Sequence, residues 1–169
     1  MDILVYCAGE WRVSTWLTFA MIRRPMRVLT CPPLTGETFP YKKLAGLNLL
    51  YLRLHGMPEQ SHLYGSKWQT AFSLEELMAE APDMSGSVVF MEGCYGRRTQ
   101  FPKAFKSLGA EHVIGSNDET ESENIFVGQS SRFGQWFVRA FVKGKSAQAS
   151  LAIAKRKSPK DVSDKFEIV

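Results

Sequence analysis

Short apolar runs that alternate with amphipathic stretches constrain the fold of this chain more than any other feature. Residues 3–7, 47–54 and 87–91 have the composition expected of strands buried on both faces of a sheet. Shorter runs at 27–30 and 112–115 predict two further strands. Between and after these runs, apolar residues recur at helical spacing in residues 13–21, 73–81, 99–108, 133–141 and 146–155. This order predicts one α/β domain, residues 1–169, with a mostly parallel central sheet and helices on both faces.

The ends of several helices are marked by their polar residues. Ser73 and Glu76 have the spacing of a capping box, so a helix should begin there and stop before Pro82. Ser146 predicts the start of the last helix. The residues after it, 157–169, are rich in charge, and we expect them to form a frayed tail.

Composition excludes several classes of protein. Of the 169 residues, 44% are hydrophobic, and the net charge of +4 is not gathered into one block, so a dedicated nucleic-acid-binding protein is not indicated. The longest uncharged stretch, residues 13–22, is too short for a helix that spans a membrane, which needs about 18 residues or more. The chain has no basic start before a long apolar region, so we expect no signal peptide. We expect a cytoplasmic domain that binds neither nucleic acid nor membranes.

The cysteine pattern argues against disulfides and metal. Cys7, Cys31 and Cys94 are odd in number and contain no close pair, so neither a disulfide framework nor a zinc site is predicted. Cys7 and Cys31 are interpreted as packing residues. Cys94 differs from them because it follows an apolar run and has glycine beside it.

Two reactive side chains come directly after predicted strands. His55 follows the run 47–54, and Cys94 follows the run 87–91, 39 positions later. Because parallel strands end at the same edge of a sheet, we expect these two side chains to lie close together there. A thiol, a histidine and backbone N–H donors are the groups that cysteine hydrolases need. The adjacent Gly56 and Gly93 would let a substrate backbone approach.

At these residues the chain resembles the caspase-like (clan CD) cysteine peptidases, and it looks most like their CHAT-domain branch. The matching segments are Leu49-Leu-Tyr-Leu-Arg-Leu-His-Gly56 and Val88-Val-Phe-Met-Glu-Gly-Cys-Tyr-Gly96, and Leu108-Gly-Ala-Glu-His-Val-Ile-Gly-Ser116 is similar to a later part of CHAT-type domains. The resemblance covers about residues 47–155. It implies a caspase-like three-layer α/β/α sandwich, a peptide or protein substrate, and no metal or organic cofactor.

The resemblance also implies a role for each site residue. Cys94 would be the nucleophile and His55 the general acid that protonates the leaving amine. The backbone N–H groups of Gly56 and Cys94 would form the oxyanion hole. In this family the two catalytic side chains face each other across the scissile bond, and no third carboxylate is needed.

Acidic residues near the predicted site indicate a substrate preference. Glu92 stands at the end of an apolar strand, and burial of an unpaired carboxylate costs several kcal/mol, so it should face water, a cation or a ligand. Metacaspase-like relatives have an acidic residue at the matching position that helps to bind a basic side chain. The resemblance therefore makes Glu92 a candidate for selecting Arg or Lys before the scissile bond, with Asp118 and Glu119 as further candidates.

Two other hypotheses remain open from the sequence. The chain could be an inactive caspase-like fold that binds a peptide or protein in the same cleft. It could also be an unrelated doubly wound domain for a small molecule, in which His55 and Cys94 meet by accident. A regulatory protein partner is compatible with the first two hypotheses, and the sequence does not predict an oligomeric state.

Overall fold

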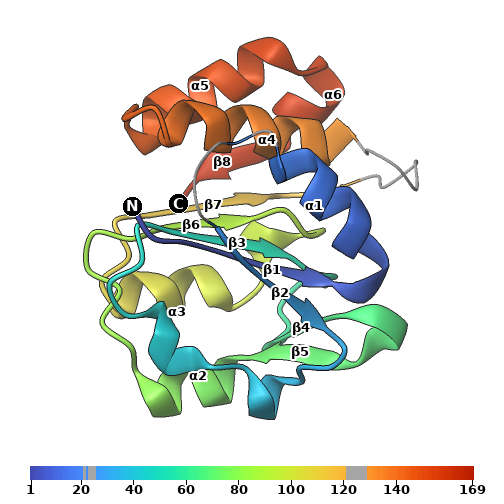
Figure 1. Ribbon diagram of the computed structural model, residues 1–169, viewed down its shortest axis with the longest axis vertical. Coiled ribbons are helices and arrows are strands. Elements are labelled where there is room, and N and C mark those ends of the chain that lie inside the picture. The colour runs from blue at the N-terminus through green and yellow to red at the C-terminus, as the bar shows by residue number, and fades with distance from the viewer. Residues whose placement is uncertain (21, 23–25, 121–128) are drawn as a thin grey trace.

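In the computed structural model, which describes residues 1–20, 22, 26–120 and 129–169, a six-stranded sheet forms the centre of the molecule (Figure 1). Its strands, in spatial order, are β2 (Arg27–Cys31), β1 (Ile3–Ala8), β3 (Leu49–Arg53), β6 (Val88–Met91), β7 (His112–Ser116) and β8 (Phe166–Ile168). All neighbouring pairs are parallel except β7 and β8, which are antiparallel. The predicted α/β class and mostly parallel sheet are confirmed.

Helices cover both faces of this sheet (Figure 1). On one face lie α1 (Arg12–Ala20), α4 (Gln129–Phe141), α5 (Ala147–Lys157) and α6 (Lys160–Ser163). On the other lie α2 (Leu74–Glu80), α3 (Phe101–Ser107) and a hairpin of β4 (His62–Tyr64) and β5 (Thr70–Ser73). Alternate residues of the strands point to opposite faces. Leu4 and Tyr6 therefore belong to the core under α2 and α3, and Ile3 and Val5 to the core under α1, α4 and α5.

The predicted helix caps form. Ser73 Oγ accepts a hydrogen bond from the backbone N–H of Glu76 at 3.5 Å, and Ser146 Oγ accepts one from Ala149 at 3.2 Å. No helix within the described part of the chain is both long and apolar enough to cross a membrane.

Helix α1 has its polar side turned inward. Ser14 and Thr15 are buried, whereas Val13, Trp16 and Leu17 are exposed. The buried hydroxyl groups accept hydrogen bonds from the guanidinium of Arg53 on β3, at 2.9 and 2.8 Å. The helix predicted for residues 13–21 forms up to residue 20, and residue 21 lies outside the described residues. Its apolar stripe faces outward, because the inward side supplies acceptors to the buried Arg53.

The expected frayed tail is wrong. Residues 160–163 form α6, and β8 pairs with β7 at the edge of the sheet. Phe166 is fully buried and stacks on Phe133 at a ring distance of 4.5 Å. A single buried aromatic residue therefore anchors a segment whose charge is typical of a solvated tail. The chain end after β8 and the start of β1 both lie near the amino ends of the parallel strands (Figure 1).

Candidate active site

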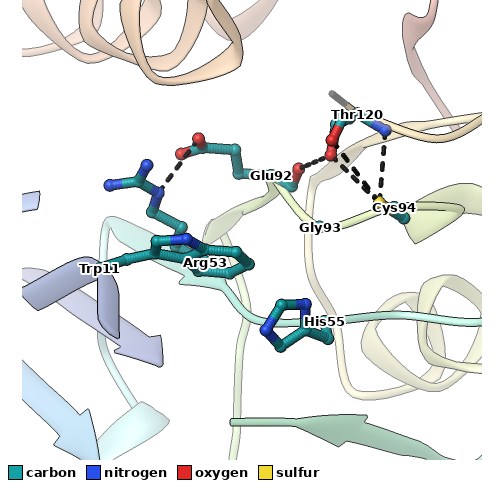
Figure 2. A pocket seen from close by; sticks show the side chains of 7 residues that line it. All are labelled: Trp11, Arg53, His55, Glu92, Gly93, Cys94 and Thr120. Carbon is teal, nitrogen blue, oxygen red and sulfur yellow. Dashed lines mark hydrogen bonds and ion pairs between the residues drawn. The ribbon is translucent and has the colours of Figure 1, made fainter. Parts of the chain in front are cut away.

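The structure brings His55 and Cys94 to one cavity at the carboxyl edge of the sheet (Figure 2). Strands β3 and β6 pair in parallel with Leu52 opposite Met91, so the residues that follow the two strands emerge side by side. The cavity has a volume of about 40 Å³, which is far below the roughly 300–1,000 Å³ of pockets that enclose a small-molecule ligand. Its lining residues are Trp11, Arg53, His55, Glu92, Gly93, Cys94 and Thr120.

His55 is held by its backbone and by its ring. Its N–H and C=O both pair with Tyr64 of β4, at 2.8 Å each, so the β4–β5 hairpin fixes the main chain here. The imidazole lies between two indoles, with ring centroids 4.4 Å from Trp11 and 5.2 Å from Trp68. Its Nε2 lies 2.8 Å from Oε1 of Glu10. The side chain remains 27% exposed, so a bound molecule could still reach it.

Glu10 was missed by sequence reasoning, which found no carboxylate suited to orient the histidine. It lies in η1 (Gly9–Trp11), the short 3₁₀ helix that follows β1. Because β1 is the parallel neighbour of β3, the segments that follow these two strands lie together at the carboxyl edge. If the apolar runs at residues 3–7 and 47–54 are paired as parallel neighbours, Glu10 is expected near His55. This pairing is the signal that could have identified Glu10 from the sequence.

Cys94 is the partly exposed cysteine, and its sulfur points toward Thr120 (Figure 2). Sγ accepts a hydrogen bond from the Thr120 N–H at 3.3 Å and lies 3.5 Å from the Thr120 hydroxyl. Cys7 and Cys31 are both fully buried. Burial raises the pKa of the Cys7 thiol to about 11 and also raises that of Cys31, which disfavours their thiolates.

The two glycines of the site allow its loops to touch. A Cβ on Gly56 would overlap the carbonyl oxygen of Cys94, and a Cβ on Gly93 would overlap that of Leu54. Any larger residue would force apart the segments that follow β3 and β6. The N–H groups of Gly56 and Cys94, the predicted oxyanion hole, donate to no acceptor among the residues that the structure describes.

Glu92 faces a cation, as the cost of burying a carboxylate requires, but that cation belongs to the chain. Its Oε1 lies 3.2 Å from Nε of Arg53, and the two side chains are only 4% and 6% exposed. The Tyr51 hydroxyl donates to Oε2 at 2.5 Å. Burial, and then the nearby carboxylate, raise the pKa of Tyr51 well above its ordinary value, so this hydroxyl stays a donor. A basic substrate side chain would have to compete with Arg53 for Glu92.

Asp118 and Glu119 lie beside the segment that follows Cys94. Both are exposed. The Asp118 carbonyl accepts from the Tyr95 N–H at 3.1 Å, and the Tyr95 hydroxyl donates to Glu119 Oε1 at 3.3 Å. Neither residue is among those that line the cavity. They therefore lie outside the cavity, next to the segment that follows Cys94.

The described residues contain no group of three or more His, Cys, Asp or Glu side chains arranged to hold a metal ion. No protein-family model matches the chain, and no curated protein matches it either.

Proposed function

We propose that this protein is a caspase-like cysteine endopeptidase in which Cys94 is the nucleophile and His55 the general acid. The observation that carries the proposal is that His55 and Cys94, 39 positions apart in the chain, line one cavity at the carboxyl edge of the sheet. The parallel sheet with helices on both faces supports the caspase-like sandwich, which is part of this proposal.

The chemistry needs no group beyond those present. The Cys94 thiol passes its proton to His55, and the resulting thiolate adds to the carbonyl carbon of the scissile bond, where the N–H groups of Gly56 and Cys94 stabilise the oxyanion. When the C–N bond breaks, His55 gives its proton to the leaving nitrogen. Water then attacks the thioester, which releases the carboxylic acid and restores the thiol. The thiol is turned to Thr120 and the imidazole lies on the other side of Gly93 (Figure 2), so a substrate would bind at the rim of the small cavity.

A second candidate, an inactive binding domain with the same fold, is favoured by two observations. The Cys94 sulfur is engaged by Thr120, and the cavity is small, with a volume of about 40 Å³. A site of this kind could hold a peptide at its rim without attacking it.

Labelling with a peptide acyloxymethyl ketone separates the two candidates. We expect the folded native protein to form an adduct on Cys94, and mass spectrometry of its fragments locates that adduct. The buried Cys7 and Cys31 are internal controls in the same sample. The Cys94→Ala variant should not be labelled. If the ketone reacts with Cys94 no faster than with a free thiol in solution, the result would favour the inactive binding domain.

Basic peptides should be the preferred substrates. We expect peptides with Arg or Lys before a reporter group to be cleaved faster than those with Asp, with Asp118 and Glu119 supplying the negative charge. Exposed ion pairs contribute about 0.2–1 kcal/mol each, so the Asp118→Asn/Glu119→Gln variant should lose roughly fivefold of this preference. Glu111→Gln, an exposed acid before β7 at the opposite edge of the sheet, is the matched control. A native preference for Asp would contradict the assignment.

A further inference from the structure

The imidazole of His55 has two nitrogens in different surroundings. Nε2 lies 2.8 Å from Oε1 of Glu10. Figure 2 shows one ring nitrogen directed toward Trp11 and the other, Nδ1, on the side of Gly93 and Cys94. The ring is therefore bound at one nitrogen and presents the other to the cavity it shares with the nucleophile.

Glu10 is itself fixed in place. The Ser66 hydroxyl donates to its Oε2, and the Glu10 N–H donates back to Ser66 Oγ at 3.3 Å. Ser66 belongs to η4 (Ser66–Trp68), the turn of the β4–β5 hairpin, which also supplies the indole of Trp68 against the imidazole. Two segments far apart in the chain, 9–11 and 66–68, thus enclose one histidine ring.

The charge of Glu10 determines which nitrogen of His55 carries the proton. Burial raises the pKa of Glu10, but hydrogen bonds from Ser66 and His55 outweigh this effect and hold it below its ordinary value. The carboxylate is therefore ionised at neutral pH and can only accept hydrogen bonds. Neutral His55 must then carry its proton on Nε2, which leaves the lone pair of Nδ1 facing the cavity.

We propose that Glu10 is a positioning residue for the reaction, which holds His55 as the Nε2–H tautomer with Nδ1 directed at the scissile bond. This inference rests on the proposed endopeptidase function. In the protonated state both nitrogens carry hydrogen. Nδ1 then transfers its proton to the leaving nitrogen, while Nε2–H stays bound to the carboxylate. Cys94, His55 and Glu10 thus form a triad, in which Cys94 is the nucleophile, His55 the acid–base group and Glu10 the residue that orients His55.

The tautomer can be measured without any substrate. In protein labelled with ¹⁵N at histidine, the imidazole ¹⁵N shifts distinguish protonated from unprotonated nitrogens. The His55 signals are assigned by their loss in His55→Gln, and His62 and His112 are internal references. We expect the Nε2–H form in the native protein and a mixture of both tautomers in Glu10→Ala. A native Nδ1–H form, or a tautomer unchanged in Glu10→Ala, would overturn the proposal.

Kinetics give a second and independent test. In metal sites, loss of the outer residue that orients a ligating histidine lowers metal affinity or activity by about 10–100-fold. We expect Glu10→Ala to lower kcat by about that factor and to leave KM within about twofold, because Glu10 contacts the histidine and does not line the cavity. Glu10→Asp, which keeps the charge, should recover part of kcat. Glu37→Ala, which removes an exposed acid from another 3₁₀ turn, is the control.

The experiments distinguish failure of the endopeptidase proposal from failure of the positioning role of Glu10. If native protein neither cleaves peptides nor forms an adduct at Cys94, the endopeptidase proposal is wrong, whatever the tautomer. If native protein is active and Glu10→Ala has an unchanged kcat, the endopeptidase proposal stands and the positioning role is wrong.

Discussion

Replacement of Cys94 by alanine is expected to reduce peptide hydrolysis to background, a loss on the order of 10⁴-fold or more. Without the sulfur no thioester can form, and the backbone donors that remain would act only on attack by water. The fold should persist, because Cys94 is only partly buried and alanine fits within its volume. Turnover of a reporter peptide, beside a far-ultraviolet spectrum of each variant, measures both effects.

His55→Gln should reduce turnover by a similar factor, and the Cys94→Ala/His55→Gln double variant should be little worse than either single one. Residues that act as a unit show this lack of additivity. His62→Gln is the matched control, because His62 is a half-exposed histidine on β4 that does not line the cavity. Hydrolysis that survives in Cys94→Ala, or that falls equally in His62→Gln, would show that another site is responsible.

Arg53→Met is expected to destabilise the protein by about 3–5 kcal/mol, the usual cost of breaking a buried ion pair from one side. The substitution leaves Glu92 with the Tyr51 hydroxyl but without its cation, and it also removes the donor to Ser14 and Thr15. Helix α1 should loosen as a result. Urea unfolding gives the free energy of unfolding of each variant.

Two further variants make this result specific. Glu92→Gln added to Arg53→Met removes the buried charge and keeps an acceptor for Tyr51, so it should recover part of the loss. Lys42→Met breaks an exposed pair, Lys42–Glu80, in which the lysine is 84% exposed, and should cost no more than about 1 kcal/mol. If Arg53→Met and Lys42→Met lower the free energy of unfolding equally, the buried Arg53–Glu92 pair does not stabilise the site more than an exposed pair does.

The main elements of the fold could be predicted because each has its own periodic signal. Strands β1 and β6 are continuous apolar runs, β3 is apolar up to Arg53, and the N-termini of α2 and α5 carry serine caps. The β4–β5 hairpin and β8 have strands of only three or four residues, too short for a period to appear. Their positions depend on tertiary contacts such as the burial of Phe166.

The placement of His55 and Cys94 at one edge followed from strand order, but the residues around them depend on register. Arg53 and Glu92 each stand two positions before a site residue, on adjacent parallel strands, and Leu52 pairs with Met91. Side chains at equivalent positions of neighbouring strands lie on the same face, so these two meet. The cost of burying a carboxylate predicts water, a cation or a ligand beside Glu92, but only the strand register identifies Arg53 as the group that lies there.

Both ends of the chain lie near the amino ends of the parallel strands, and the candidate site lies at their carboxyl ends (Figure 1). Any polypeptide joined to either end would therefore be tethered on the side of the molecule remote from Cys94. An affinity tag or a fluorescent reporter could be attached at either end without being held against the cavity. The same arrangement would allow immobilisation on a surface with the candidate site facing the solution.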